Sequence, residues 1–425
     1  MYGARRHFWT LSMTFYLLIM LSACNQVVNH KTAANSSTPP STPASTETMQ
    51  TCPAPATARA AVMASVLNGK HPHLVYLFYS HGSGTLRRYD MTTASTTTLL
   101  QIGSMPMKAN VSPDGQWLLL ITEVQGRSAL QLLRLDGQQL QTLYCTPSGG
   151  KIDNALFSPD QHALLFSEEV GKGGNGPLIG SLSLLDVETG KLHTEASWSY
   201  TVGALSYPGF SPLKWADESS VYLAGSHLPA HLLDGPPNFY LLRDINKDVS
   251  QQKSNIQLIQ ASATENDCEV VDVTPDNKQI VCSTDPHRRR QSDEPATIEL
   301  RPLAGKAFQT IYRDRGGDVD VRVLSNSTLL FLQYRPGSQD TLWKMNTDGS
   351  RATQLMRSPS KGYDGLLTFP FNRQPWSLVS RDGQYYVLKI GNNRLVIGSL
   401  AGGQQTTIGT QQDDASLDPV GWSQV

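Results

Sequence analysis

The stretch VSPDGQWLLLI at residues 111–121 decides the fold, because an apolar residue leads into Ser-Pro-Asp-Gly and an apolar run follows it. Proline fixes φ for a tight turn, aspartate caps the turn through its side chain, and glycine takes the positive φ. The β-branched and aromatic residues on either side favour extended strands. The stretch therefore predicts two antiparallel strands joined by a short turn.

The same pattern recurs along the chain. Clear copies are FSPDQHALLFS at 157–167, VTPDNKQIVCS at 273–283 and VSRDGQYYVLKI at 379–390, and fainter ones are FSPLKWADESSVYLAG at 210–225 and VLSNSTLLFLQ at 323–333. With the Ser or Thr of each turn as a marker, successive copies stand 46 to 63 residues apart. Each period also brings a second strand pair around a Gly-containing turn, as in SALQLLRLDGQQLQTLY at 128–144. Two hairpins per period of this size predict an all-β chain folded as a β-propeller of four-stranded blades.

The two ends of the repeat region complement each other. LVYLFYS (74–80), TLRRYDM (85–91) and STTTLLQI (95–102) read as the last three strands of a blade without its first, and DPVGWSQV (418–425) reads as a first strand without the other three. Pairing the two pieces closes a ring and hides the edge strands that an open array would expose. Six complete units and one shared blade predict seven blades, with six or eight as the alternatives because two copies are faint.

The SPDG turns and strands such as LWKMNTDG (342–349) resemble the TolB/PD40 "WD40-like" propeller repeats, over roughly residues 70–425. The resemblance implies a propeller domain over 70–425 and says little about activity. TolB itself carries an α/β domain before its propeller, and this chain has no room for one. A TolB-like partnership with other envelope proteins is therefore in doubt.

The N-terminal region reads as an export and anchoring signal. A short basic region, Arg5–His7, precedes an apolar run that ends in Leu21-Ser22-Ala23-Cys24. The run is too short for a comfortable membrane span, and the small residues before Cys24 resemble the bacterial lipobox. That resemblance implies a lipoprotein signal peptide over 1–23 and a lipidated Cys24. Residues 24–69 are rich in Ser, Thr and Pro, which predicts a disordered tether. We therefore expect a propeller held by its lipid anchor at a bacterial membrane, outside the cytoplasm.

Composition limits the function. The 425 residues carry a formal net charge of -1 and only 17% charged residues, which argues against nucleic acid as a partner. The four cysteines after Cys24 make disulfides reasonable in an exported protein. Cys268 and Cys282 lie symmetrically about a predicted turn near Pro275 and should face each other on antiparallel strands, which makes a disulfide between them possible. A pair between Cys52 and Cys145 has less support, because Cys52 lies within the tether.

The long connections should gather on one face. In an antiparallel blade, the first-to-second and third-to-fourth turns open on one side, and these are short here. The second-to-third and blade-to-blade connections are longer and open on the other side, which we call the loop face. Loops on rigid scaffolds carry binding residues, and arginine with aromatic side chains is typical of binding hot spots. The predicted ligand-binding residues on this face are Trp198, Tyr200, His227, His231, Arg288, Arg289, Arg290, Tyr312, Arg315, Tyr334 and Arg335.

The sequence contains no recognisable catalytic residue, nor any motif that requires a metal or another cofactor. We therefore predict a non-enzymatic binding or scaffold module that takes a protein, peptide or glycan on the loop face. The alternative is a propeller enzyme, either a metal-dependent polysaccharide lyase or a hydrolase. In that case His227, His231 and His287 would line the channel mouth, because neutral imidazoles from neighbouring loops can bind a divalent metal.

Overall fold

The computed structural model describes residues 51–55, 57, 69, 71–102, 108–171, 177–201, 209–226, 238–245, 256–260, 268–284, 295–304, 308–315, 317–335, 337–410, 412 and 414–424. The chain divides into the units Met1–Pro43 and Ala44–Val425, and only the second contains described residues. The predicted signal peptide over 1–23 and Cys24 lie outside them. Of the helices in the described part, none is long and apolar enough to cross a membrane.

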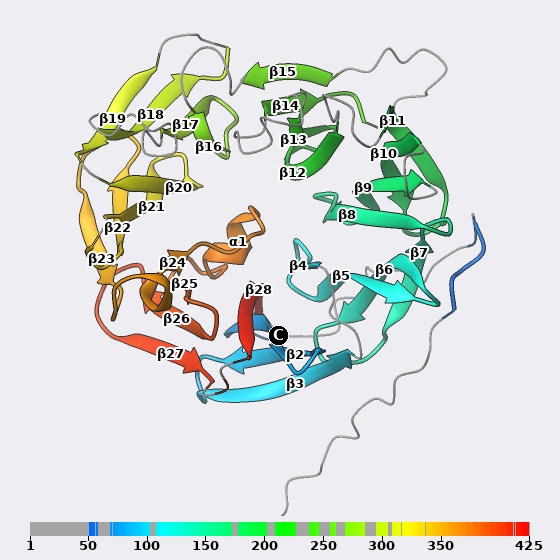
Figure 1. The fold of residues 1–425 in the computed structure, drawn as a ribbon, viewed down its shortest axis with the longest axis horizontal. Helices are drawn as coiled ribbons and strands as arrows, with labels where there is room; N and C mark the ends of the chain where they lie inside the picture. The colour runs from blue at the N-terminus through cyan, green and yellow to red at the C-terminus, as the bar shows by residue number, and fades with distance from the viewer. Residues whose placement is uncertain are drawn as a thin grey trace, which may run out of the picture. The chain divides into compact units, whose positions relative to one another are not determined.

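The Ala44–Val425 unit is a ring of seven four-stranded antiparallel sheets, which confirms the predicted seven-bladed propeller (Figure 1). We number the blades from the one that combines the first and last strands. In each blade the first strand named lies nearest the centre of the ring.

Blades 1 to 3 contain, in this order, β28 (Ser416–Gln424), β1 (Pro72–Ser80), β2 (Ser83–Asp90) and β3 (Ser95–Ile102); β4 (Lys108–Val111), β5 (Trp117–Val124), β6 (Arg127–Arg134) and β7 (Gln141–Cys145); and β8 (Gly150–Phe157), β9 (Ala163–Gly171), β10 (Pro177–Asp186) and β11 (Leu192–Thr201). Blades 4 and 5 contain β12 (Gly209–Asp217), β13 (Ser220–Ser226), β14 (Asn238–Leu242) and β15 (Ile256–Gln260); and β16 (Cys268–Val273), β17 (Gln279–Thr284), β18 (Ala296–Pro302) and β19 (Gln309–Asp314). Blades 6 and 7 contain β20 (Asp318–Ser325), β21 (Thr328–Tyr334), β22 (Thr341–Asn346) and β23 (Thr353–Arg357); and β24 (Leu367–Thr368), β25 (Tyr385–Ile390), β26 (Arg394–Ser399) and β27 (Gln405–Gly409). Two short helices, η3 (Tyr363–Gly365) and α1 (Pro375–Leu378), precede and follow β24.

A shared hydrogen-bond network explains the repeated SPDG turn. In the first copy the Ser112 hydroxyl donates to Asp114 at 2.5 Å and accepts from the backbone N–H of Trp117 at 3.0 Å. The side chain thus satisfies backbone groups that the turn leaves unpaired. The same arrangement recurs at Ser158, Thr274 and Ser380. The copy at 210–225 differs: Ser211 and Pro212 lie within β12, and the turn comes at residues 218–219. The predicted turn at Ser211 is therefore wrong, because the ladder shifts register beside Pro212 and continues.

The ring closes as predicted. β28 pairs antiparallel with β1, and Trp422 lies opposite Leu74. Trp422 is fully buried, and its indole N–H donates to the Leu378 carbonyl of blade 7 at 3.3 Å. Blade 1 therefore takes strands from both ends of the Ala44–Val425 unit.

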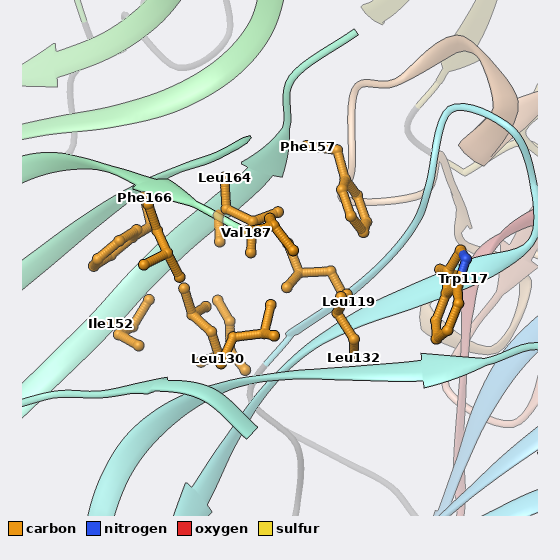
Figure 2. Packing of buried hydrophobic residues seen from close by; sticks show 13 residues of the cluster. Trp117, Leu119, Leu130, Leu132, Ile152, Phe157, Leu164, Phe166 and Val187 are labelled. Atoms are coloured by element: carbon orange, nitrogen blue, oxygen red, sulfur yellow. The ribbon is translucent and has the colours of Figure 1, made fainter. Parts of the chain in front are cut away.

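The hydrophobic core lies between neighbouring blades. Figure 2 shows one cluster, which contains Trp117, Leu119, Leu130 and Leu132 of blade 2 and residues of blade 3 such as Phe166. All of these side chains are buried. Because each blade buries its faces against two neighbours, the core forms a continuous ring that holds the inner strands in place.

One disulfide fixes a point of the predicted tether. Cys52 is bonded to Cys145, with 5.7 Å between their Cα atoms. Cys52 packs against Val124 and Ala129 at the end of blade 2 that carries the loop face. This pair had little support at the level of the sequence, since no motif there shows that the tether turns back onto a blade.

The predicted opposition of Cys268 and Cys282 is wrong in register. Cys282 lies opposite Val271, and Cys268 lies opposite Thr284, because the ladder shifts between Cys268 and Val270. Cys282 is disulfide-bonded, and the side chain of Cys268 lies outside the described residues. Its pairing with Cys282 stays a prediction.

Candidate functional site: the channel cavity

The inner strand of blade 7 is interrupted. β24 pairs with β25 at Thr368↔Lys389, and the next bridge joins Val379 to Tyr386. Between these two bridges the inner strand runs eleven residues, from Thr368 to Val379, whereas the paired stretch of β25 runs three, from Lys389 to Tyr386. Residues 369–378, which lie between the two bridges and include α1, form a loop that we call the plug. Figure 1 shows α1 inside the ring, on the channel side of the blades.

Polar contacts tie the plug to blades across the ring. The Trp376 indole N–H donates to the Val111 carbonyl of blade 2 at 2.8 Å. The Asn372 amide donates to the Asn110 side chain of the same blade, and the Arg373 guanidinium donates to the Val271 carbonyl of blade 5. The plug therefore crosses the channel and is held on both sides.

A cavity of about 940 Å³ lies against the plug. Its lining includes inner-strand residues of all seven blades, among them Asn110, Asn154, Ser211, Val271, Arg322, Thr368 and Asp418. Phe369, Asn372 and Arg373 of the plug line it as well, whereas residues 374–378 do not. The first part of the plug thus forms one end of the cavity, and the rest packs beyond it.

The cavity opens on the loop face. Its lining includes Gly391 and Asn392, between the second and third strands of blade 7, and Tyr363 and Leu366, between blades 6 and 7. Of the SPDG-type turn residues that the structure describes, none lines the cavity. The cavity therefore lies on the side where the sequence places the binding surface.

The lining is positively charged overall. Its cations are Lys108, Arg322, Arg373 and Lys389, and its anions are Asp153 and Asp418. Lys108 lies 3.4 Å from Asp153, and Lys389 lies 2.5 Å from Asp418, so these lysines are neutralised locally. Arg322 pairs with Asp320 at 2.8 Å, so Arg373 carries the remaining positive charge of the lining.

Three of the predicted binding residues, Trp198, Tyr312 and Tyr334, lie in strands β11, β19 and β21 and make packing contacts. Trp198 meets Phe210 edge to face at 5.4 Å between ring centroids, and a Cβ on Gly180 would overlap its indole. The Tyr334 hydroxyl donates to the Leu367 carbonyl at 2.9 Å, and burial raises its pKa well above the ordinary value. The Tyr312 ring lies 4.6 Å from Phe331, and its hydroxyl accepts a hydrogen bond from Gln333 at 2.9 Å.

Two of the predicted ligand-binding arginines, Arg315 and Arg335, are described by the structure, and both lie outside the cavity. Arg335 forms an ion pair with the buried Asp314 at 2.8 Å, and Arg315 is exposed. None of the five predicted residues whose side chains are described lines the cavity. The side chain of Tyr200 and all of His227, His231, Arg288, Arg289 and Arg290 lie outside the described residues, so their part in binding stays a prediction.

The metal alternative rests on residues that the structure leaves undescribed. Within the described ranges no group of three His, Cys, Asp or Glu side chains could hold a metal. His227, His231 and His287 all lie outside those ranges, so the predicted metal site stays untested.

The plug was not predicted from the sequence. The repeat turn at 379–383 is preceded by the ten residues FPFNRQPWSL at 369–378. In the other copies a continuous strand leads into the turn. Pro370 and Pro375 cannot donate backbone hydrogen bonds to a ladder. The two prolines just before a repeat turn were the available signal.

Comparisons support the fold and leave the family unsettled. No protein-family model and no curated protein matches the sequence. A putative 6-phosphogluconolactonase from Bacteroides fragilis matches in structure with a TM-score of 0.51 at 12% identity, over 85% of this chain and 99% of its own. The corresponding protein from Bacteroides uniformis gives a TM-score of 0.51 at 12% identity, over 84% and 99%. At such identities the likeness shows the fold alone.

TolB from Acinetobacter baumannii is also among the similar structures, with a TM-score of 0.43 at 14% identity. The match covers 69% of this chain and 65% of the TolB chain. We draw no functional argument from so distant a match. The resemblance to the TolB/PD40 repeats beyond a common propeller fold stays a prediction.

Proposed function

We propose that this protein is an exported, lipid-anchored propeller that binds a ligand in its channel cavity without transforming it. The observation that carries the proposal is the plug, which converts an open channel into a pocket with an end wall. A volume of about 940 Å³ falls in the usual range of ligand pockets, about 300–1,000 Å³. Of the partner classes predicted from the sequence, the pocket suits the end of a peptide or glycan chain, and its size also suits a small molecule, which the sequence did not predict.

The pocket can be tested by filling it. Thr368 lines the cavity, whereas Thr97 is exposed on the outer strand β3. We expect Thr368→Trp to weaken ligand binding, because the indole takes up part of the cavity, and Thr97→Trp to preserve it. Thermal shifts of the full chain in detergent, screened against metabolites, short peptides and oligosaccharides, measure this. A saturating ligand at about 100 times its Kd stabilises the fold by about 2.7 kcal/mol.

The same screen can refute the proposal. Compounds that stabilise wild type and Thr368→Trp equally would show that binding lies outside the cavity. Circular dichroism of both tryptophan variants verifies that each is folded before the comparison is made.

The lipid anchor is tested separately. We expect Cys24→Ser to move the protein from the membrane fraction to the soluble exported fraction, because the acylated sulfur is lost. Fractionation and immunoblotting measure the distribution. Cys52→Ser is the matched control and should stay in the membrane fraction. Retention of Cys24→Ser with the membranes would refute lipid anchoring at this residue.

A further inference from the structure

Arg373 lies at the end wall of the cavity with one backbone partner. Its guanidinium donates to the Val271 carbonyl, and the side chain lines the cavity. Among the described residues, no carboxylate oxygen lies within 4.0 Å of it. A guanidinium has five N–H donors, so most of them remain for a ligand.

The nearby carboxylates are already engaged. Asp320 accepts from Arg322 at 2.8 Å. Asp272 accepts from the backbone N–H groups of Val273 and Val323, at 2.8 and 2.9 Å, and lies 3.9 Å from Lys214. Three cations, Lys214, Arg322 and Arg373, thus face two carboxylates, and one positive charge is left over at the cavity wall.

The surroundings disfavour that charge. Burial, and next the neighbouring Arg322, lower the pKa of Arg373 to about 10. Asp272 and Asp320 act on this pKa in the opposite direction, but no described carboxylate contacts the guanidinium directly, so its desolvation is only partly compensated. A bound anion would relieve this cost.

Two exposed aromatic rings line the cavity, Phe371 on the plug and Tyr363 between blades 6 and 7. Phe371 is 77% exposed and Tyr363 is 65% exposed, although both are large hydrophobic residues. Both line the cavity, and Lys108 lies 4.7 Å from the Phe371 ring centroid. Exposed aromatic side chains beside a pocket provide flat apolar surfaces for a ligand body.

We propose that the cavity binds a small organic anion, with its oxyanion group hydrogen-bonded to Arg373 and its body against Phe371 and Tyr363. The inference rests on the proposed function and names the ligand class of the same site. A carboxylate and a phosphate group both fit a guanidinium, and the experiment distinguishes them.

The test uses benzoate as the anionic probe and benzamide as its neutral counterpart. Ligand-observed NMR titrations use the full chain in detergent micelles, and the signal from protein-free micelles is subtracted as the blank. We expect wild type to bind benzoate at least tenfold more tightly than benzamide, because hydrogen bonds between charged groups are stronger than neutral ones. Arg373→Gln should remove that difference.

Two further variants serve as controls for the effect of Arg373→Gln on benzoate binding. Arg357 is exposed at the end of the outer strand β23, so Arg357→Gln should retain the benzoate preference. Arg373→Lys keeps the positive charge and should retain part of it, which keeps the inference testable if Arg373→Gln does not fold. Displacement of benzoate by inorganic phosphate at constant ionic strength would extend the site to phosphates, and no displacement would narrow it to carboxylates.

The failures are distinguishable. Equal binding of benzoate and benzamide, lost in Thr368→Trp, would overturn the anion site and leave the cavity proposal standing. A benzoate preference that survives Arg373→Gln would also overturn it. Benzoate binding that is unchanged in Thr368→Trp would refute both proposals.

Discussion

Replacing Trp422 by alanine is expected to lower the free energy of unfolding by about 3–5 kcal/mol, the usual cost of removing a large buried aromatic side chain. Trp422 is fully buried in β28, packs among residues of blades 1 and 7, and stacks on Tyr385 at 6.3 Å between ring centroids. The substitution also leaves the Leu378 carbonyl without its indole donor. The variant therefore weakens the closing strand of the ring.

Urea denaturation followed by circular dichroism measures this change, with the slope of the transition as a check on cooperativity. Phe371→Ala is the control, because Phe371 is 77% exposed and its truncation should change stability by no more than about 0.5 kcal/mol. A loss below about 1 kcal/mol for Trp422→Ala would contradict the tight seating of β28 in blade 1.

Cys52→Ser is expected to lower the free energy of unfolding by about 2–4 kcal/mol. The Cys52–Cys145 disulfide joins residues 93 positions apart, so breaking it releases a long loop in the unfolded chain. Chemical denaturation of wild type and variant, each with and without reductant, measures the effect.

Denaturation with and without reductant distinguishes the contribution of the Cys52–Cys145 disulfide from that of the disulfide at Cys282. In wild type, reductant should remove at least the stability lost in Cys52→Ser. Any further loss in the reduced variant reports the bond at Cys282. Equal stability of oxidised wild type and Cys52→Ser would show that the bridge contributes nothing to the fold.

The sequence predicted the fold well because its signal is local and repeated. Ser112, Asp114 and their equivalents act within five residues, so each SPDG turn can be recognised without its neighbours. Ring closure followed from the complementary fragments near Leu74 and Trp422, which pair directly. The faint copy at Ser211 failed because proline also fits beside an irregularity in a strand.

The site was harder to predict. The end wall of the cavity is the plug, an insertion found in blade 7. Comparison of the repeats brings out the residues that all copies share and passes over a segment that only one copy contains. Trp198, Tyr312 and Tyr334 were assigned to loops, yet β11, β19 and β21 extend through them. Their rings pack against neighbouring residues, which strand periodicity alone does not reveal. Arg373 was overlooked because its importance depends on partners in blades 5 and 6 that are distant in sequence.

The plug has a consequence for recognition geometry. Seven similar inner strands arranged about an axis present nearly equivalent surfaces, so a molecule in a bare channel can adopt several rotated poses of comparable energy. A loop that belongs to one blade removes that degeneracy, since it places the Arg373 guanidinium and the Phe371 ring at one position around the axis. The repeated blades then provide a rigid frame, and the one blade that differs from the others fixes the orientation of the bound molecule.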